Sequence, residues 1–318
     1  MAGPAVTEGQ QTRPVAPSKA PQPRATSSLA RRQARLAWLL LLPTLLVVAF
    51  VAIYPLIQTI WYGFTNARLG SVTPPRFVGL KNYQDLIADS AFRSSILVTV
   101  KFTVITVVIE FLLGMLIALV VNSNFKGRGL TRAAMLVPWA IPTVISAQMW
   151  KWMYHDVYGV FNDLLVNKLG LLSHNVAWLS QPNTSLPAIA AVDIWKTTPF
   201  VALLLLAGLQ VIPSDVYEAA TVDGANRLRQ FFDMTLPLLQ PAIVVTLIFR
   251  TLDALRVFDV FYVAFGARPD TMTMAIYDQQ NIVAFADVGY GSAISMAIFV
   301  VIAIFVIAYV TTFKVEAQ

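Results

Sequence analysis

The chain has 318 residues, of which 57% are hydrophobic and only 13% are charged, and it carries a formal net charge of +6 with no cysteine. Soluble domains carry about a quarter charged residues, so this composition argues against a soluble enzyme and places most of the chain in lipid or against other lipid-embedded helices. The lack of cysteine excludes disulfides, cysteine nucleophiles and cysteine-ligated metals. Many of the positive charges stand beside hydrophobic segments, which indicates membrane topology and not nucleic-acid binding.

The N-terminal segment, residues 1–35, is rich in Pro, Ala, Ser, Thr, Gln and Arg, and we predict a disordered cytosolic tail. Residues 36–57 carry no charge, and this stretch is longer than the core of a signal peptide and long enough to cross the bilayer as a helix. Further spans are predicted at about residues 95–121, 133–154, 186–209, 241–265 and 291–312. Residues 36–318 are therefore predicted to form one all-α membrane domain with six transmembrane helices.

The two sides of these spans differ in positive charge, since nearby lysines and arginines divide nine to six. The larger group comprises Arg31, Arg32, Arg35, Lys126, Arg128, Arg132, Arg227, Arg229 and Lys314. The smaller group comprises Arg68, Arg76, Lys81, Arg93, Lys168 and Arg268. The positive-inside rule assigns the larger group to the cytosol, so we predict that both termini and the polar segment between the fourth and fifth spans are cytosolic.

Ionisable residues inside the predicted spans mark candidate functional positions, because such groups are costly in lipid and normally face a partner or a water-filled path. Glu110 lies in the middle of the second span, and we interpret it as a buried contact to a polar group on another helix. The fourth span opens with Asp193 and Lys196 on neighbouring positions of one helical face. The fifth span contains a ladder whose charge alternates every three residues, so that neighbours can neutralise each other along the helix. The members of this ladder are Arg250, Asp253, Arg256 and Asp259.

Aromatic residues are interleaved with these charges in the fourth and fifth spans. They are Trp195, Phe200, Phe249, Phe258, Phe261 and Tyr262. Carboxylates beside aromatic faces suit a sugar, whose hydroxyls need hydrogen bonds and whose C–H faces need a flat apolar surface. We therefore predict that these two spans line a sugar pathway, the alternative being that the aromatics serve only packing or anchoring at the membrane interface.

Several catalytic motifs do not occur in the sequence. There is no G-x-x-x-x-G-K-[ST], so the chain does not bind ATP by a P-loop, and there is no H-E-x-x-H zinc motif. The only two histidines, His155 and His174, fall in or beside a loop, which disfavours an intramembrane serine–histidine protease. We therefore expect a chain that performs no covalent chemistry.

The polar segment at about residues 213–237 contains the stretch "EAATVDGANRLRQFFDMTLPLLQPAI". It resembles the E-A-A-x-x-x-G loop by which permease subunits of binding-protein-dependent ABC importers contact their ATPase. The resemblance assigns ATPase coupling to residues of the first half of this stretch, with Gly224 permitting a sharp turn between two short helices. These residues are Glu218, Ala219, Ala220, Asp223, Gly224 and Ala225.

Three other stretches resemble the maltose-type carbohydrate branch of these importers, in particular its maltose-F-like subunit. They are "FVGLKNYQDLIADSAFRSSILVTVKFT", "MLVPWAIPTVISAQMWKWMY" and "WKTTPF". In that branch "WKTTPF" belongs to a helix that contacts sugar, so Asp193, Lys196, Thr197 and Phe200 are expected to line the substrate path. Asp253 and Phe258 join them on the chemistry of the fifth span.

The resemblance implies the type I ABC importer transmembrane-domain fold in a bacterial cytoplasmic (inner) membrane. It implies a second homologous permease, two cytosolic ATPase subunits that hold ATP and Mg, and an extracytoplasmic sugar-binding protein, with no cofactor on this chain. The expected substrate is a di- or oligosaccharide of the maltose or trehalose kind. The alternatives are an ABC permease for another solute such as glycerol phosphate, and a self-sufficient ion-coupled carrier using Glu110, Asp193 and Asp253.

Overall fold

A computed structural model of the chain describes residues 28–312, and the elements in this range are helices, with two isolated bridges and no sheet. The chain divides into two compact units, residues 1–56 and 57–318. Helix α1 (Ser28–Val48) passes through a π-helical turn (Ala49–Ile53) into α2 (Tyr54–Gly63), and the boundary between the units falls within α2. This helix begins at Ser28, inside the stretch predicted to be a tail, and residues 1–27 lie outside the described part of the chain.

Among residues 28–312, four helices are long and apolar enough to cross a membrane: Arg32–Gly63, Ser90–Asn122, Pro182–Leu209 and Val288–Thr312. Two further helix pairs are apolar enough but are bent, by 85° at residues 141–142 and by 67° at residue 239. Each of the six predicted hydrophobic segments therefore coincides with one long helix or with part of one bent pair. Within the predicted third span the helix is interrupted at residues 141–142, and within the fifth at residues 256–258.

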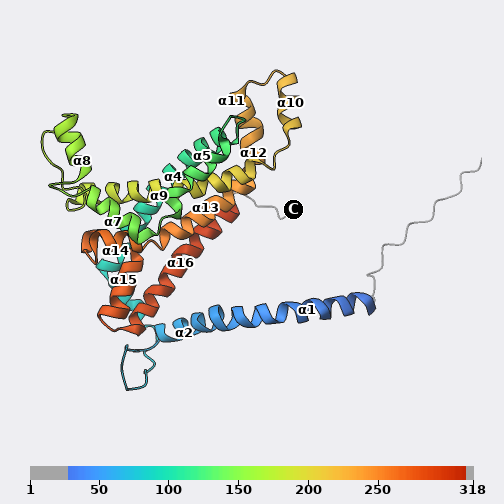
Figure 1. Ribbon diagram of the computed structural model, residues 1–318. Helices are drawn as coiled ribbons and strands as arrows, with labels where there is room; N and C mark the ends of the chain where they lie inside the picture. The colour runs from blue at the N-terminus through green and yellow to red at the C-terminus, as the bar shows by residue number, and fades with distance from the viewer. Residues whose placement is uncertain (1–27, 313–318) are drawn as a thin grey trace, which may run out of the picture. The chain divides into compact units, whose positions relative to one another are not determined.

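The second unit (Figure 1) is built around α4 (Ser90–Asn122) and α9 (Pro182–Leu209), which pack along each other, with α13 (Gln240–Leu255) against both. Gly114 of α4 permits this close approach, because a Cβ there would lie 2.6 Å from Cγ1 of Val201 on α9. The C-terminal helix α16 (Val288–Thr312) packs on α13 and on α15 (Met274–Gln279). The remaining elements are α3 (Lys81–Ala88), α5 (Arg128–Met135), α6 (Val137–Ala140), α7 (Thr143–Met153), α8 (Val160–Asn162), η2 (Asp163–Lys168), α10 (Ser214–Val222), α11 (Arg227–Gln230), η3 (Phe231–Thr235), α12 (Leu236–Leu238), α14 (Asp259–Phe265), η4 (Pro269–Thr271) and η5 (Gln280–Ala284).

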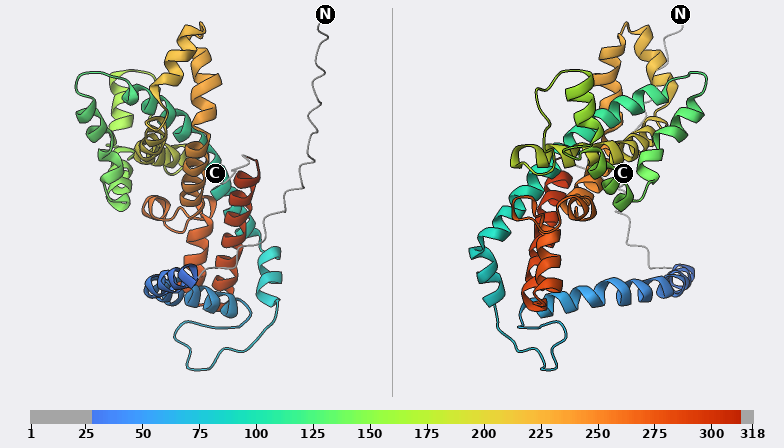
Figure 2. Two further views of the ribbon diagram at one scale, coloured as in Figure 1. Left: turned by 90° about the vertical axis from the view of Figure 1, so that its right-hand side faces the viewer. Right: turned by 60° about the vertical axis from the view of Figure 1, so that its left-hand side comes forward.

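Different helices lie at the two ends of the second unit (Figure 2). Helices α10, α11 and α12 project at one end, and α15 lies at the opposite end. Between these ends two apolar clusters form the core, one around Phe102, Phe261 and Ile294 and the other around Leu205 and Leu239. A polar site placed between the clusters is therefore distant from both ends of the bundle.

Candidate functional site

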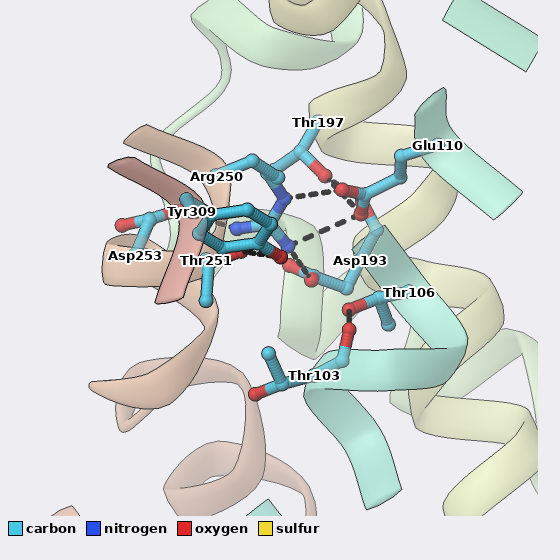
Figure 3. Close-up of polar contacts among 9 residues, drawn as sticks. All are labelled: Thr103, Thr106, Glu110, Asp193, Thr197, Arg250, Thr251, Asp253 and Tyr309. Atoms are coloured by element: carbon cyan, nitrogen blue, oxygen red, sulfur yellow. Dashed lines mark hydrogen bonds and ion pairs between the residues drawn. The ribbon is translucent and has the colours of Figure 1, made fainter. Parts of the chain in front are cut away.

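Four charged side chains from three helices meet in the middle of the bundle, and we call Glu110, Asp193, Arg250 and Asp253 the charge cluster (Figure 3). The guanidinium of Arg250, which is 3% exposed, is ion-paired to Glu110 on α4 and to Asp193 on α9. It also donates from Nη1 to Oδ2 of Asp253 on its own helix, at 2.8 Å. A planar guanidinium with five donors can satisfy several carboxylates at once, so this single residue ties α4, α9 and α13 together.

Glu110 is fully buried and receives a further hydrogen bond, from Oγ1 of Thr197 at 2.5 Å. The interpretation of Glu110 as a buried contact to polar groups on other helices is therefore confirmed. A buried carboxylate is tolerated in lipid only when it is paired and its lone pairs are occupied, and both conditions are met here. The sequence alone could not identify Arg250 as the partner, because the two residues are 140 positions apart.

The predicted charge ladder is present only in its first step. Arg250 and Asp253 pair at i, i+3, but α13 ends at Leu255 and α14 begins at Asp259. Within residues 28–312 neither Arg256 nor Asp259 forms an ion pair, so neutralisation along the helix is limited to Arg250 and Asp253. Because the helix is broken between Leu255 and Asp259, Arg256 and Asp259 do not stand on one continuous helical face, and both side chains are exposed.

A cavity of about 440 Å³ lies beside the charge cluster. Its wall includes the break between α6 and α7, the cluster residues Asp193, Arg250 and Asp253, and the break between α13 and α14. A neighbouring cavity of about 340 Å³ shares Trp139, Thr197 and Arg250 with it and adds Phe200 and Phe249. Each helix break therefore contributes to the cavity wall. At each break, backbone groups that an unbroken helix would hydrogen-bond internally can face the cavity.

The structure brings the six predicted substrate-path residues to this place. Asp193, Lys196, Thr197, Asp253 and Phe258 line the larger cavity, and Phe200 lines the smaller one. Sequence reasoning missed Trp139, which lines both cavities and stacks on Phe200 with ring centroids 5.5 Å apart and planes within 12°. The signal for it was the pair of prolines at 138 and 142, which marks a break that exposes the residues between them.

The polar segment forms the two short helices that were predicted, joined by a tight turn. Gly224 has φ +79°, a left-handed conformation that favours glycine, and the turn is closed by the N–H of Ala225 donating to the carbonyl of Ala220 at 2.9 Å. Asn226 caps α11 by accepting from the N–H of Arg229 at 2.9 Å. Helix α10 begins at Ser214, and Pro213 occupies its N-cap position.

The residues predicted for coupling differ in exposure. Glu218, Ala219 and Asp223 are exposed, Ala225 is half-buried and Ala220 is buried. Within the described residues no hydrogen bond or ion pair is formed by the carboxylates of Glu218 and Asp223. The segment thus presents charged groups that the chain itself does not use.

A helical bundle with apolar spans, a polar cavity between the two ends of the bundle and a projecting helical knob is typical of a membrane transport subunit. Among the described residues no group of three or more His, Cys, Asp or Glu side chains could hold a metal ion. Comparison with known proteins agrees with this class. Residues 110–315 match the family described as binding-protein-dependent transport system inner membrane component, and the chain belongs to that family.

Similar sequences cover nearly the whole chain. It is 45% identical to the trehalose/maltose transport system permease protein MalF of Thermococcus litoralis, over 89% of this chain and 95% of that protein. It is 42% identical to the sulfoquinovosyl glycerol transport system permease protein SmoG of Agrobacterium fabrum, over 87% and 90%. It is 37% identical to the trehalose transport system permease protein SugA of Mycobacterium tuberculosis, over 92% and 93%.

The fold is also that of a solved transporter chain. A crystal structure of a bacterial ABC transporter involved in the import of the acidic polysaccharide alginate matches with a TM-score of 0.77 at 24% identity, covering 90% of this chain and 98% of that one. The prediction of an ABC importer permease fold is confirmed at this level.

Proposed function

We propose that the chain is the permease subunit of an ATP-driven importer for an uncharged di- or oligosaccharide of the trehalose or maltose kind. The cavity beside the charge cluster carries this proposal, because it combines carboxylates and a hydroxyl with the aromatic faces of Trp139 and Phe258. Hydroxyls of a sugar need such acceptors, and its C–H faces need such rings. The names of relatives at 45% and 37% identity support the trehalose or maltose class.

In this proposal residues 36–318 form one membrane domain of six spans with both termini in the cytosol, each bent helix pair supplying one span. The chain pairs with a second, homologous permease, two ATPase subunits that bind ATP and Mg, and an extracytoplasmic sugar-binding protein. A second solved chain of the alginate importer, matched at a TM-score of 0.75, comes from a complex with a periplasmic protein. ATP binding closes the ATPase pair. The polar segment at residues 213–237, which we call the coupling segment, transmits that rigid-body motion to the bundle.

Uptake assays test the proposal directly. The chain, reconstituted in vesicles with its partner subunits and binding protein, is expected to take up trehalose or maltose only when ATP is supplied. Asp253→Asn is expected to raise the sugar concentration for half-maximal uptake about tenfold, since one charged hydrogen-bond acceptor in the cavity is weakened. Asp85→Asn, on an exposed carboxylate paired to Lys81, is the control and should change nothing. Uptake by this chain alone, driven by an ion gradient, would show that it is a secondary carrier.

Glu218→Lys tests the coupling segment. The reversal places a cation where the segment offers a free, exposed carboxylate, so we expect loss of ATP-driven uptake and weaker co-purification of the ATPase. Asp215→Lys reverses a charge on the same helix, three residues earlier, and should leave both measurements close to wild type. Equal losses in the two variants would mean that the net charge of the segment matters and not the position of Glu218.

One observation favours a second candidate, an importer of an anionic sugar. Arg256 lines both cavities, is exposed and has no ion-pair partner within residues 28–312, so it could receive a sulfonate or carboxylate. A relative 42% identical is named for sulfoquinovosyl glycerol. Competition of labelled trehalose by neutral and anionic sugars separates the two candidates, and Arg256→Gln should abolish binding only of an anionic substrate.

A further inference from the structure

Lys196, which was expected to line the substrate path, donates hydrogen bonds to backbone oxygens and forms no ion pair with a carboxylate among the described residues. Its side chain is buried, and Nζ donates to the carbonyl of Ile141 at 2.5 Å and to that of Trp139 at 3.3 Å. The carbonyl of Ile141 lies in the break between α6 and α7, and that of Trp139 lies in α6, next to this break. Ile141 and Pro142 there have extended backbone, with ψ of 132° and 138°.

This break leaves carbonyls without helical partners. The last carbonyls of any helix have no intrahelical donor, and Pro142 has no N–H to offer. At membrane depth no bulk water replaces the missing donors, and irregular backbone survives there only where protein or an aqueous cavity satisfies it. Lys196 supplies two of the missing hydrogen bonds, and its positive charge suits the negative end of a helix dipole.

The same device recurs in the second unit. Lys151 of α7 donates to the carbonyl of Val263 in α14 at 2.9 Å, and Arg132 of α5 donates to the carbonyl of Val121 in α4 at 3.1 Å. Cations that satisfy helix-end carbonyls of a neighbouring element are thus a repeated feature of this bundle. Lys196 differs in one respect, since the segment that it holds, residues 139–143, forms one wall of the larger cavity.

We propose that Lys196 is a positioning residue that fixes this wall, and that its ammonium sets sugar affinity through Trp139 and not by binding the sugar itself. Phe200 lies one helical turn further along α9, on the same face as Lys196. Lys196 donates to the backbone carbonyl of Trp139, and the ring of Phe200 stacks on its indole, so both parts of Trp139 are fixed by α9. This inference rests on the proposed sugar-binding function of the cavity. It replaces the expectation that Lys196 is itself a substrate contact.

The test uses the full transporter in nanodiscs, with 5-fluorotryptophan incorporated and the Trp139 resonance assigned by Trp139→Phe. Lys196→Met keeps length and removes the donors, so the sugar-free Trp139 resonance should shift or broaden, and affinity for every deoxy analogue of the sugar should fall by the same factor, about tenfold. Lys196→Arg restores donors to both carbonyls and should recover resonance and affinity. Lys151→Met removes the other lysine cap, away from the cavity, and should leave the Trp139 resonance unchanged.

The proposal is overturned if Lys196→Met leaves the Trp139 resonance in place while affinity falls for all but one deoxy analogue, which would identify Lys196 as a ligand of that hydroxyl. It is also overturned if the variant changes neither measurement. Should Lys196→Met not assemble, Lys196→Gln keeps neutral donors and should hold the resonance closer to wild type than Lys196→Ala does. Failure of the wild-type transporter to bind any sugar would instead refute the proposed function, and the sugar-free resonance would still test the positioning role.

Discussion

The charge cluster and the coupling segment are both polar parts of a mostly apolar chain, yet they use their charges in opposite ways. In the cluster, Arg250 engages three carboxylates and Glu110 has no exposed surface. In the coupling segment, Glu218 and Asp223 are exposed and carry no partner within the described residues. Charged groups that are paired within the fold hold helices together, and charged groups that have no partner in the described part of the chain are available to another chain.

This difference separates the consequences of mutation. Removing one member of a buried, hydrogen-bonded ion cluster leaves an uncompensated charge in a medium of low dielectric constant. Removing an exposed charge costs the isolated chain little, since surface ion pairs contribute roughly 0–1 kcal/mol. Variants of the three buried members, Glu110, Asp193 and Arg250, should therefore fail in folding and assembly, whereas variants at the exposed positions Glu218 and Asp223 should fold normally and fail in transport.

The largest effect is expected for Arg250→Met. The substitution leaves Glu110 and Asp193 buried without their cation, and breaking such a cluster typically costs about 3–5 kcal/mol. We expect a large fall in the thermal midpoint of the detergent-solubilised permease, or failure to assemble. Arg229→Met removes an exposed i, i+4 pair with Asp233 and should shift the midpoint little. If the two variants melt alike, the cluster does not stabilise the bundle.

Asp278 is a half-buried carboxylate that, unlike Glu110, has no cation paired with it among the described residues. Asp278 on α15 accepts a hydrogen bond from Ser295 at 2.6 Å and forms no ion pair within residues 28–312, and burial raises its pKa to about 6. A raised pKa of a folded-state carboxyl means that the native protein holds a proton that the unfolded chain has released. Stability should therefore fall as pH rises from about 4 to 6 and then level off.

Asp278→Asn removes this titration while keeping the shape of the side chain. The variant should be more stable than wild type above pH 6, by on the order of 2 kcal/mol, and its thermal midpoint should lose the dependence on pH between 4 and 6. Asp163→Asn is the control, because that carboxylate is exposed and paired to Lys168 at 3.1 Å. A variant that keeps the wild-type pH profile would mean that another group is responsible for it.

How far the sequence predicts each region follows from the range of the interactions involved. Gly224 and its turn are determined by neighbours within six residues, so the coupling segment was predictable as two short helices joined at that glycine. The hydrophobic segments were equally predictable from local composition. The partner of Glu110 and the role of Lys196 were not, because residues 140 and 55 positions away decide them. Contacts of that kind depend on how helices pack, which local pattern does not encode.

The smallest effect on stability and the most selective effect on transport are expected for Gly224→Ala. A Cβ at φ +79° costs about 1 kcal/mol, although no atom lies within 4 Å of it, so only the turn and not the packing is disturbed. The turn sets how α10 is presented relative to α11. ATP-driven uptake should therefore fall several-fold while the thermal midpoint of the permease stays near that of wild type. Gly129→Ala, in α5 and with equally open surroundings but no positive φ, should leave both measurements unchanged. Equal transport in the two variants would mean that the coupling segment tolerates a distorted turn.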